Sequence, residues 1–155
     1  MTAKVELRLR GTLDHLRVAW QTGETLIESI PFAEDPEGTR YNILLAVQEM
    51  VTNVLRHGYG SSQSGPGADD TPLEIDFEAD AGGVTITVRD RGPAFDPTTV
   101  DSDPIASDDF PQIEGGYGIM IAKMVMDSLD YERDGEWNVL RMTKLAASPA
   151  KQTAS

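Results

Sequence analysis

The residues best suited to chemistry are a carboxylate and a carboxamide, Glu49 and Asn53, spaced four positions apart. Four residues is close to one helical turn, so on a helix the two side chains are neighbours. Their oxygen atoms can hold a hard cation, or orient a water molecule or a hydroxyl group. The alternative is an ordinary solvated polar face. The apolar residues nearby follow helical spacing and predict an amphipathic helix packed on a core: Ile43, Val47, Met50, Val51 and Val54.

A second candidate stands where a predicted strand ends. Alternating apolar and polar residues lead up to Asp90, and Gly92 follows two positions later. An aspartate at this place can accept a hydrogen bond from an exocyclic amine, while the glycine lets a flat ring approach the backbone. A plain turn aspartate is the alternative, because Asp and Gly are common turn residues.

A third candidate is the glycine-rich start of a predicted helix, with Gly115, Gly116 and Gly118. Glycines before a helix let backbone amides approach an anion at the positive helix end. The pattern lacks the lysine and hydroxyl residue of a P-loop, and it follows an acidic loop where a dinucleotide fingerprint would follow a strand. A tight turn is the alternative interpretation.

Composition limits the class of protein. The 155 residues suffice for one domain with a proper core. The formal net charge of −13 argues against general affinity for nucleic acid or anionic membranes. Cysteine is absent, which excludes disulfides and thiolate chemistry. The start lacks signal-peptide features and no apolar run has the length of a membrane span, so we expect a cytoplasmic protein.

Periodicity predicts an α+β fold: a two-layer sandwich with a mixed or mostly antiparallel sheet and helices on one face. We expect one domain over residues 1–145 and a flexible tail over 146–155. The apolar pattern of the first helix fits imperfectly at residues 22–23, which leaves a break or kink open there. The predicted elements are a strand at 4–10, a helix from 13 to 29, an acidic loop at 32–38, a long helix capped at 57–58, a loop at 60–71, strands at 73–78 and 84–89, a long loop at 98–113, a helix from 119 to 129, and a closing hairpin turned at 134–135.

Together the three motifs resemble the N box and the two glycine boxes of the GHKL, or Bergerat, ATP-binding fold of gyrase, histidine kinases and MutL. Within it the sequence is most similar to the single-domain anti-sigma-factor serine/threonine kinases of the RsbW and SpoIIAB type. The matching segments are 46–58, 90–97 and 114–119, and the resemblance extends over residues 5–145. Phe95, Asp96 and Pro97 stand in place of a second glycine after Gly92, which favours this branch over histidine kinases.

The resemblance implies a role for each motif residue. Asn53 would be a ligand of Mg²⁺ bridging the ATP phosphates, and Glu49 would be the general base for the acceptor hydroxyl. Asp90 would read the adenine amino group and Gly92 would make room for the ring. The ATP-binding residues would be completed by amides presented to the phosphates from Gly115, Gly116 and Gly118. Residues 98–113 would form the ATP lid.

Other positions leave alternatives open. Arg56, Arg91 and Lys123 are candidates for the positive charge that stabilises the transition state, and each is equally well read as a surface residue. Thr143 is a candidate support for the adenine pocket, although a solvent-facing strand threonine is the more ordinary interpretation. Tyr117 departs from the aliphatic residue expected inside the glycine box.

By resemblance, the function is that of a protein serine/threonine kinase that transfers the γ-phosphoryl group of ATP to a STAS-domain anti-anti-sigma antagonist. When free of that antagonist, it would sequester a sigma factor or another regulator of transcription by partner switching. The alternative is a nucleotide-gated binding module of the same fold with little or no kinase activity. The resemblance also implies a homodimer formed through the first strand and first helix, with no direct contact to nucleic acid or membrane.

Overall fold

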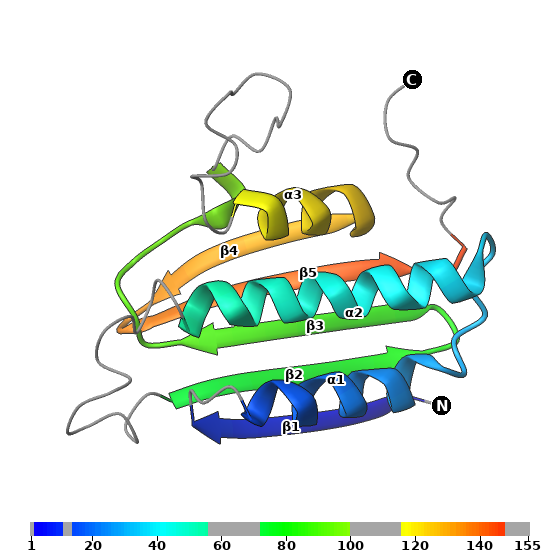
Figure 1. The fold of residues 1–155 in the computed structure, drawn as a ribbon, viewed down its shortest axis with the longest axis horizontal. Helices are drawn as coiled ribbons and strands as arrows, with labels where there is room; N and C mark the ends of the chain where they lie inside the picture. The colour runs from blue at the N-terminus through cyan, green and yellow to red at the C-terminus, as the bar shows by residue number, and fades with distance from the viewer. Residues whose placement is uncertain (1, 11–13, 56–71, 100–115, 148–155) are drawn as a thin grey trace.

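The computed structural model describes residues 2–10, 14–55, 72–99 and 116–147. Within these ranges a sheet forms one layer and the helices form the other (Figure 1), so the predicted α+β two-layer fold is confirmed. The element bounds are β1 Ala3–Arg10, α1 Asp14–Ile27, α2 Pro36–Asn53, β2 Pro72–Asp80, β3 Gly83–Asp90, the 3₁₀ turn η4 Pro97–Thr99, α3 Gly116–Val125, β4 Ser128–Asp134 and β5 Trp137–Leu145.

The described strands form one sheet in the order β1-β2-β3-β5-β4, and every pair in it is antiparallel. Because side chains alternate across a strand, one face of each strand turns to the helices. A row of register partners crosses the sheet on that face, formed by Val5, Phe77, Ile86, Met142 and Leu129. The three central members are fully buried. Burial of each side chain stabilises the fold by roughly 1.5–3 kcal/mol.

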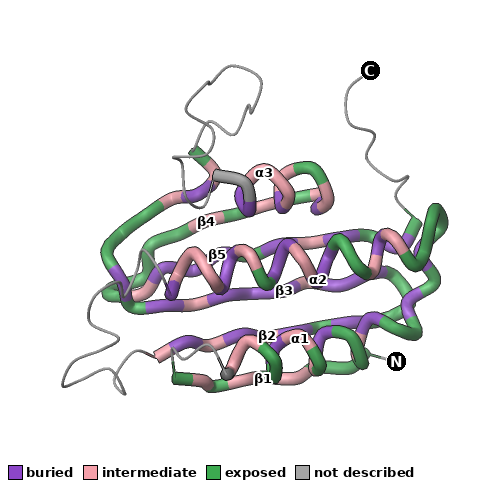
Figure 2. Tube along the Cα trace, in the orientation of Figure 1, coloured by how far each residue is buried: buried purple, intermediate pink, exposed green. Residues whose placement is uncertain are grey.

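The opposite face of the sheet carries charged residues in place of a second helix layer. Arg89 lies 3.9 Å from carboxylate oxygens of both Glu74 and Asp76, and Arg8 lies 3.8 Å from Glu74. Such partly exposed pairs contribute little to stability. Figure 2 shows the buried residues along the central strands and α2. None of the helices in the described ranges is long and apolar enough to cross a membrane.

Helix α1 is continuous through Thr22 and Gly23, so the break that the sequence left open does not occur. Gly23 serves the packing of the helix: a Cβ atom built there would lie 2.9 Å from a terminal carbon of Leu44 and 3.1 Å from the ring of Phe77. A small residue allows α1 to approach both α2 and the sheet, which offsets the low helix propensity of glycine.

Helix α2 begins at Pro36, so the acidic loop predicted over residues 32–38 is shorter than expected. Proline fits the first helical position because its missing N–H group needs no partner there. Asp35 caps the helix in a left-handed conformation (φ 41°), and its carboxylate accepts from the Gly38 N–H at 3.2 Å. The predicted cap at residues 57–58 lies outside the described residues.

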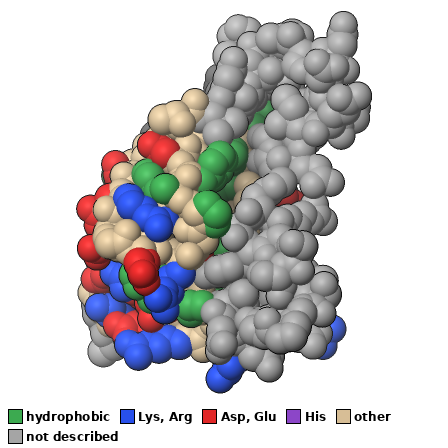
Figure 3. Space-filling view, turned by 90° about the vertical axis from the view of Figure 1, so that its left-hand side faces the viewer, with side chains coloured by type: hydrophobic (Ala, Val, Ile, Leu, Met, Phe, Trp, Pro, Cys, Tyr) green, Lys and Arg blue, Asp and Glu red, His purple; other side chains and the backbone are tan. Residues whose placement is uncertain are grey.

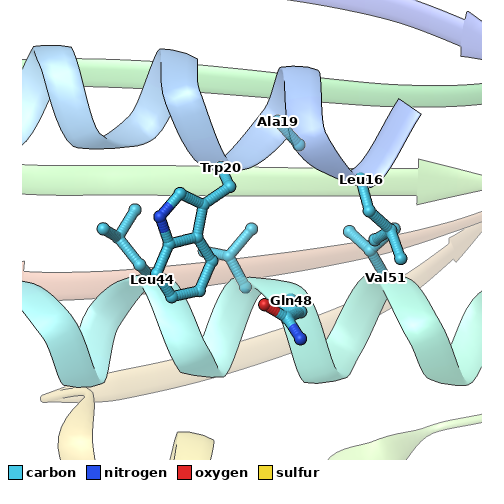
Figure 4. A pocket seen from close by; sticks show the side chains of 7 residues that line it. Leu16, Ala19, Trp20, Leu44, Gln48 and Val51 are labelled. Carbon is cyan, nitrogen blue, oxygen red and sulfur yellow. The ribbon is translucent and has the colours of Figure 1, made fainter. Parts of the chain in front are cut away.

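The two long helices pack through an aromatic side chain. Trp20 reaches from α1 across α2 near Leu44, and Gln48 lies further along the same groove (Figure 4). The Trp20 ring meets the half-exposed Tyr41 ring edge-on, with centroids 6.1 Å apart. The groove is lined almost entirely by apolar side chains, which is typical of helix packing.

The end of α3 corrects another prediction. The helix ends at Val125, one turn earlier than its apolar spacing predicted, and Leu129 lies in β4, the first strand of the predicted hairpin. The chain turns at Asp127, whose N–H donates to the Thr143 carbonyl at 2.8 Å and whose carboxylate accepts from the Leu145 N–H at 2.7 Å.

The hairpin turn at Gly135 (φ 60°) is confirmed. Ala146, expected in the tail, is buried and bonded to the backbone of Gly82.

Candidate functional site

Asp90 is the last residue of β3 and has only 6% of its surface exposed. Two donors converge on its Oδ1 atom, the Gly92 N–H at 2.9 Å and Nδ2 of Asn138 at 3.0 Å. No described residue donates to Oδ2. No fully buried side-chain polar atom of the described residues lacks a partner, so Oδ2 keeps contact with solvent. The carboxylate is therefore fixed through one oxygen and able to accept a donor through the other.

The residue that holds Asp90 was not identified from the sequence. Asn138 lies on β5 directly opposite Asp90 in the strand register and is 7% exposed. Besides its bond to Asp90, its Nδ2 group donates to the Pro93 carbonyl at 2.9 Å and to the Gly92 carbonyl at 3.3 Å. One amide group thus connects the end of β3 with the segment that follows it.

The carbonyl oxygen of Asn138 is also engaged. Its Oδ1 atom accepts from the Tyr131 hydroxyl at 2.6 Å, from the Arg133 guanidinium at 3.2 Å and from the Phe95 N–H at 3.3 Å. Arg133 also donates to the Gly92 carbonyl at 2.8 Å. The β4–β5 hairpin therefore supplies the polar support for the end of β3. We call these residues the base end of the site: Asp90, Gly92, Tyr131, Arg133 and Asn138.

One signal in the sequence would have pointed to Asn138. In the alternation of the last strand it shares its parity with Leu140 and Met142, which are core residues. A polar residue at an inward-facing position needs hydrogen-bond partners in the interior. The partners themselves come from other strands, so spacing along the chain does not reveal them.

Glu49 is half-buried on α2, and the glycine-rich motif packs directly against it. A Cβ atom built on Gly118 would lie 2.5 Å from the Glu49 Cβ and 3.2 Å from its Oε2. Real Cβ atoms do not approach this closely, so only glycine allows α3 to lie against α2 at this point. The predicted general base and the predicted phosphate-binding helix are thus neighbours in space.

The remaining motif residues border this contact. Asn53 is half-buried at the last position of α2, one turn beyond Glu49. Gly116 is the first residue of α3, a helix of ten residues whose first amides have no partner within the helix. Gly115 and the side chain of Tyr117 lie outside what the structure describes. We call Glu49, Asn53, Gly116 and Gly118 the phosphate end of the site.

Both ends of the site lie at the same end of the molecule. In Figure 1 the β3 arrow points to the left, and the last turn of α2 and the first turn of α3 are the left-hand ends of these helices. Figure 3 views that side, where the described surface carries interleaved acidic and basic side chains. The predicted site residues in the described ranges therefore gather at one end of the fold, in the two groups defined above.

The two basic candidates in the described ranges, Arg91 and Lys123, lie away from the phosphate end. Arg91 donates to the Glu136 carboxylate and lies over the Trp137 ring, 5.6 Å from its centroid. Lys123 is in the last turn of α3, about 10 Å along the helix axis from Gly116. That distance argues against contact with an anion bound at the start of α3. Arg56 lies outside the described residues.

Thr143 does not support the end of β3, so that hypothesis is wrong. Its hydroxyl lies 3.4 Å from the Thr85 hydroxyl, in a cross-strand pair at the other end of β3. Thr143 is five positions beyond Asn138 on the strand, an odd step, so the two side chains point to opposite faces of the sheet. The interpretation of Thr143 as an ordinary strand residue is the one that fits.

The described donor set suits one kind of metal site. No cluster of three His, Cys, Asp or Glu side chains occurs among the described residues. A single carboxamide oxygen, such as that of Asn53, is enough for a Mg²⁺ ion that keeps several waters and takes its other ligands from phosphates. The residues therefore fit a magnesium ion that binds together with a nucleotide.

Comparison with known proteins supports the resemblance. The family model of the histidine kinase-like ATPase domain matches residues 9–144. The serine/threonine-protein kinase BtrW of Bordetella bronchiseptica is 27% identical over 108 residues, which cover 70% of this chain and 72% of BtrW.

A solved structure shares the fold. The RsbU and RsbW domains of Rv1364c from Mycobacterium tuberculosis align with a TM-score of 0.62 and 15% identity, over 98% of this chain. The chain spans 35% of that longer protein, and at this identity the likeness establishes the fold alone. The predicted similarity to the RsbW type is confirmed at that level. Since the family model covers residues 9–144, with both ends of the site inside it, the chain belongs to the family of histidine kinase-like ATPase domains.

Proposed function

We propose that this chain is a protein serine/threonine kinase of the anti-sigma-factor type. It transfers the γ-phosphoryl group of ATP to a STAS-domain antagonist, and it sequesters a sigma factor or another regulator when that antagonist is not bound. Family membership implies ATP as the ligand, and the name of the relative BtrW supports serine/threonine kinase activity. The single observation that carries the proposal is the packing of Glu49 against Gly118.

The packing supports catalysis because it places a carboxylate beside the helix start that is suited to phosphate. Glu49 accepts the proton of the serine or threonine hydroxyl as its oxygen forms a bond to the γ-phosphorus, and the bond from that phosphorus to ADP breaks. Asn53 is the candidate ligand of Mg²⁺, which neutralises phosphate charge when it is bound. The amides of Gly115, Gly116 and Gly118 receive the phosphates.

At the base end, Asp90 accepts a hydrogen bond from the adenine amino group through its Oδ2 atom. This is the oxygen that Gly92 and Asn138 leave available. Gly92 gives the ring room beside the backbone. In this assignment the site distinguishes adenine by its exocyclic amine, since a buried acceptor without a donor is costly.

We further propose a cytoplasmic homodimer joined through β1 and α1. The position of β1 at one edge of the sheet supports this arrangement, because an edge strand carries backbone groups available for pairing. Its partners are proteins, in keeping with the net charge of −13.

The test is transfer of label from γ-labelled ATP to any STAS-domain protein encoded alongside this chain. We expect Glu49→Gln to bind ATP within about twofold of wild type by calorimetry and to transfer label about 10²–10⁴-fold more slowly, the usual contribution of a general base. Glu37→Gln is the matched control, because Glu37 is an exposed residue in the first turn of the same helix. It should transfer label at the wild-type rate.

Two outcomes would change the proposal. Transfer by Glu49→Gln at the wild-type rate would remove the base role from Glu49. ATP binding by the wild type without label on the STAS protein would favour the nucleotide-gated binding module, which sequesters its target without useful kinase activity.

A further inference from the structure

Asn138 is the most heavily hydrogen-bonded side chain of the base end, yet it lies outside all three sequence motifs. Its amide makes six hydrogen-bond contacts, three through Nδ2 and three through Oδ1. An asparagine amide has two donor hydrogens and two acceptor lone pairs, so its capacity is fully used and the longest contact on each side, at 3.3 Å, is a shared one. A residue that only filled space in the interior would not need such a set of partners.

The partners of Asn138 fix which way its amide points. Tyr131, Arg133 and Phe95 all offer donors to one side of the amide, so that side must be the carbonyl oxygen. The nitrogen then has to face Asp90. The reversed amide would set its oxygen against the Asp90 carboxylate and its nitrogen against three donors, which is unfavourable on both sides.

The consequence lies in the Asp90 carboxylate. Asn138 and the Gly92 N–H together hold Oδ1, which fixes the plane of the carboxylate and leaves Oδ2 as the acceptor for a ligand. Both bonds also favour a carboxylate oxygen that accepts. A ligand group that offers a donor at that position is selected over one that offers an acceptor.

We propose that Asn138 is a positioning residue that sets the base preference of the nucleotide site, by holding Asp90 with Oδ2 aimed at an exocyclic amine. The inference rests on the proposed contact between Asp90 and adenine and deepens it. It assigns specificity to the β4–β5 hairpin, 48 residues beyond Asp90 in the chain, in addition to the motif residues. Tyr131 acts one step further away, because its hydroxyl helps to orient the Asn138 amide.

The probe is the ratio of the affinities for ATP and inosine triphosphate, measured by calorimetry with Mg²⁺. Inosine triphosphate has a carbonyl oxygen where ATP has the amine, so it presents an acceptor to Asp90. The wild type should prefer ATP by about tenfold or more, as expected for hydrogen bonds to a charged group. A general loss of structure lowers both affinities, whereas a change in position of Asp90 changes their ratio.

Three variants test the role. Asn138→Asp keeps the shape and the oxygen that faces Tyr131 but replaces the donor to Asp90 by an acceptor. Asn138→Ala removes both sides of the amide. In both Asn138 variants we expect the ratio of ATP affinity to inosine triphosphate affinity to fall to about one to three. The affinity for inosine triphosphate should change less than that for ATP. Tyr131→Phe, which removes one hydroxyl and should fold even where the others do not, is expected to lower the ratio about two- to threefold.

The matched controls are Asn42→Ala and Tyr41→Phe, two exposed positions on α2, and both should keep the wild-type ratio. A wild type that binds both nucleotides equally would overturn the proposed reading of adenine by Asp90, and this inference with it. A wild type that prefers ATP, with the same preference retained in Tyr131→Phe and in each folded Asn138 variant, would overturn the positioning role alone.

Discussion

The base end and the phosphate end of the site obtain their geometry in different ways. At the base end, polar side chains from three strands are joined by hydrogen bonds of 2.6–3.3 Å centred on Asn138. At the phosphate end, the decisive feature is an absent side chain, since Gly118 lets α3 lie against Glu49. The first arrangement depends on the direction of donors and acceptors, and the second depends on space.

This difference implies two kinds of failure. A change at the base end that keeps its shape should alter which nucleotide is bound, because hydrogen-bond direction carries the information there. A change at the phosphate end should displace a helix and weaken binding and transfer for every nucleotide alike. Substitutions at the two ends therefore have distinguishable effects, and each can be matched with a control elsewhere in the fold.

The largest effect on affinity is expected for Asp90→Asn. The new amide can keep its oxygen toward Gly92 and Asn138, and its nitrogen then faces the ligand where Oδ2 stood. A donor at that place meets the adenine amine unfavourably, so ATP affinity should fall about 10–100-fold by calorimetry. Inosine triphosphate, with an acceptor there, should lose less or gain affinity.

The control for this change is Asp130→Asn, an exposed aspartate on β4 that removes the same charge away from the helix-facing side. It should leave both nucleotide affinities near the wild-type values. Equal losses of ATP and inosine triphosphate in Asp90→Asn would contradict the directional account of the base end.

A smaller effect is expected for Gly118→Ala at the phosphate end. The added methyl group would lie 2.5 Å from the Glu49 Cβ, an atom close to the backbone that cannot rotate away. Helix α3 must then move, at a cost of about 1–3 kcal/mol in the free energy of unfolding. Phosphoryl transfer should fall about tenfold or more, since displacement by a fraction of an ångström disturbs the alignment of reacting groups. Urea unfolding and transfer of label measure the two effects.

Gly23→Ala provides the comparison for Gly118→Ala. Its methyl group would meet the flexible end of Leu44 at 2.9 Å and the Phe77 ring at 3.1 Å, in the core and away from Glu49. We expect a similar loss of stability with a normal transfer rate in the folded protein. If both glycine variants lost transfer equally, the effect would be general to the fold and the special role of Gly118 would be wrong.

The sequence predicted those features of the fold and the site that depend on residues close together in the chain. Alternation and helical spacing are local, so the strands, the helices and the one-sided sheet were predicted, as were the glycine turn at Gly135 and the neighbourhood of Glu49 and Asn53. A break at Gly23 stayed open in the sequence because a glycine within a helix is typical of flexibility, whereas in the structure this glycine allows contact with Leu44 and Phe77.

The hydrogen bonds that support Asp90 could not be predicted, because they join residues that are distant in the sequence. Asn138 is 48 residues away in the chain, and only the antiparallel register places it opposite Asp90. Thr143 was one candidate support, with an ordinary strand threonine as the preferred interpretation, and its register pairing with Thr85 agrees with the preferred one. Spacing along the chain thus identified the motif residues, while pairing across the sheet decided which side chains hold them.

The smallest effect is expected for Arg91→Gln, which tests where the base end stops. Arg91 follows Asp90 directly, yet its guanidinium contacts Glu136 and Trp137, and these side chains are largely exposed: 47% for Arg91 and 75% for Glu136. Exposed pairs of this kind contribute about 0–1 kcal/mol to stability. We therefore expect a change of at most about 1 kcal/mol in the free energy of unfolding measured in urea, with ATP affinity and transfer of label within about twofold of wild type.

A tenfold slower transfer with unchanged ATP affinity would instead assign to Arg91 the positive charge that stabilises the transition state. In that case the region that matters at the end of β3 would include the outer side of the β4–β5 hairpin, and the contrast between a directional base end and a close-packed phosphate end would no longer describe the whole site.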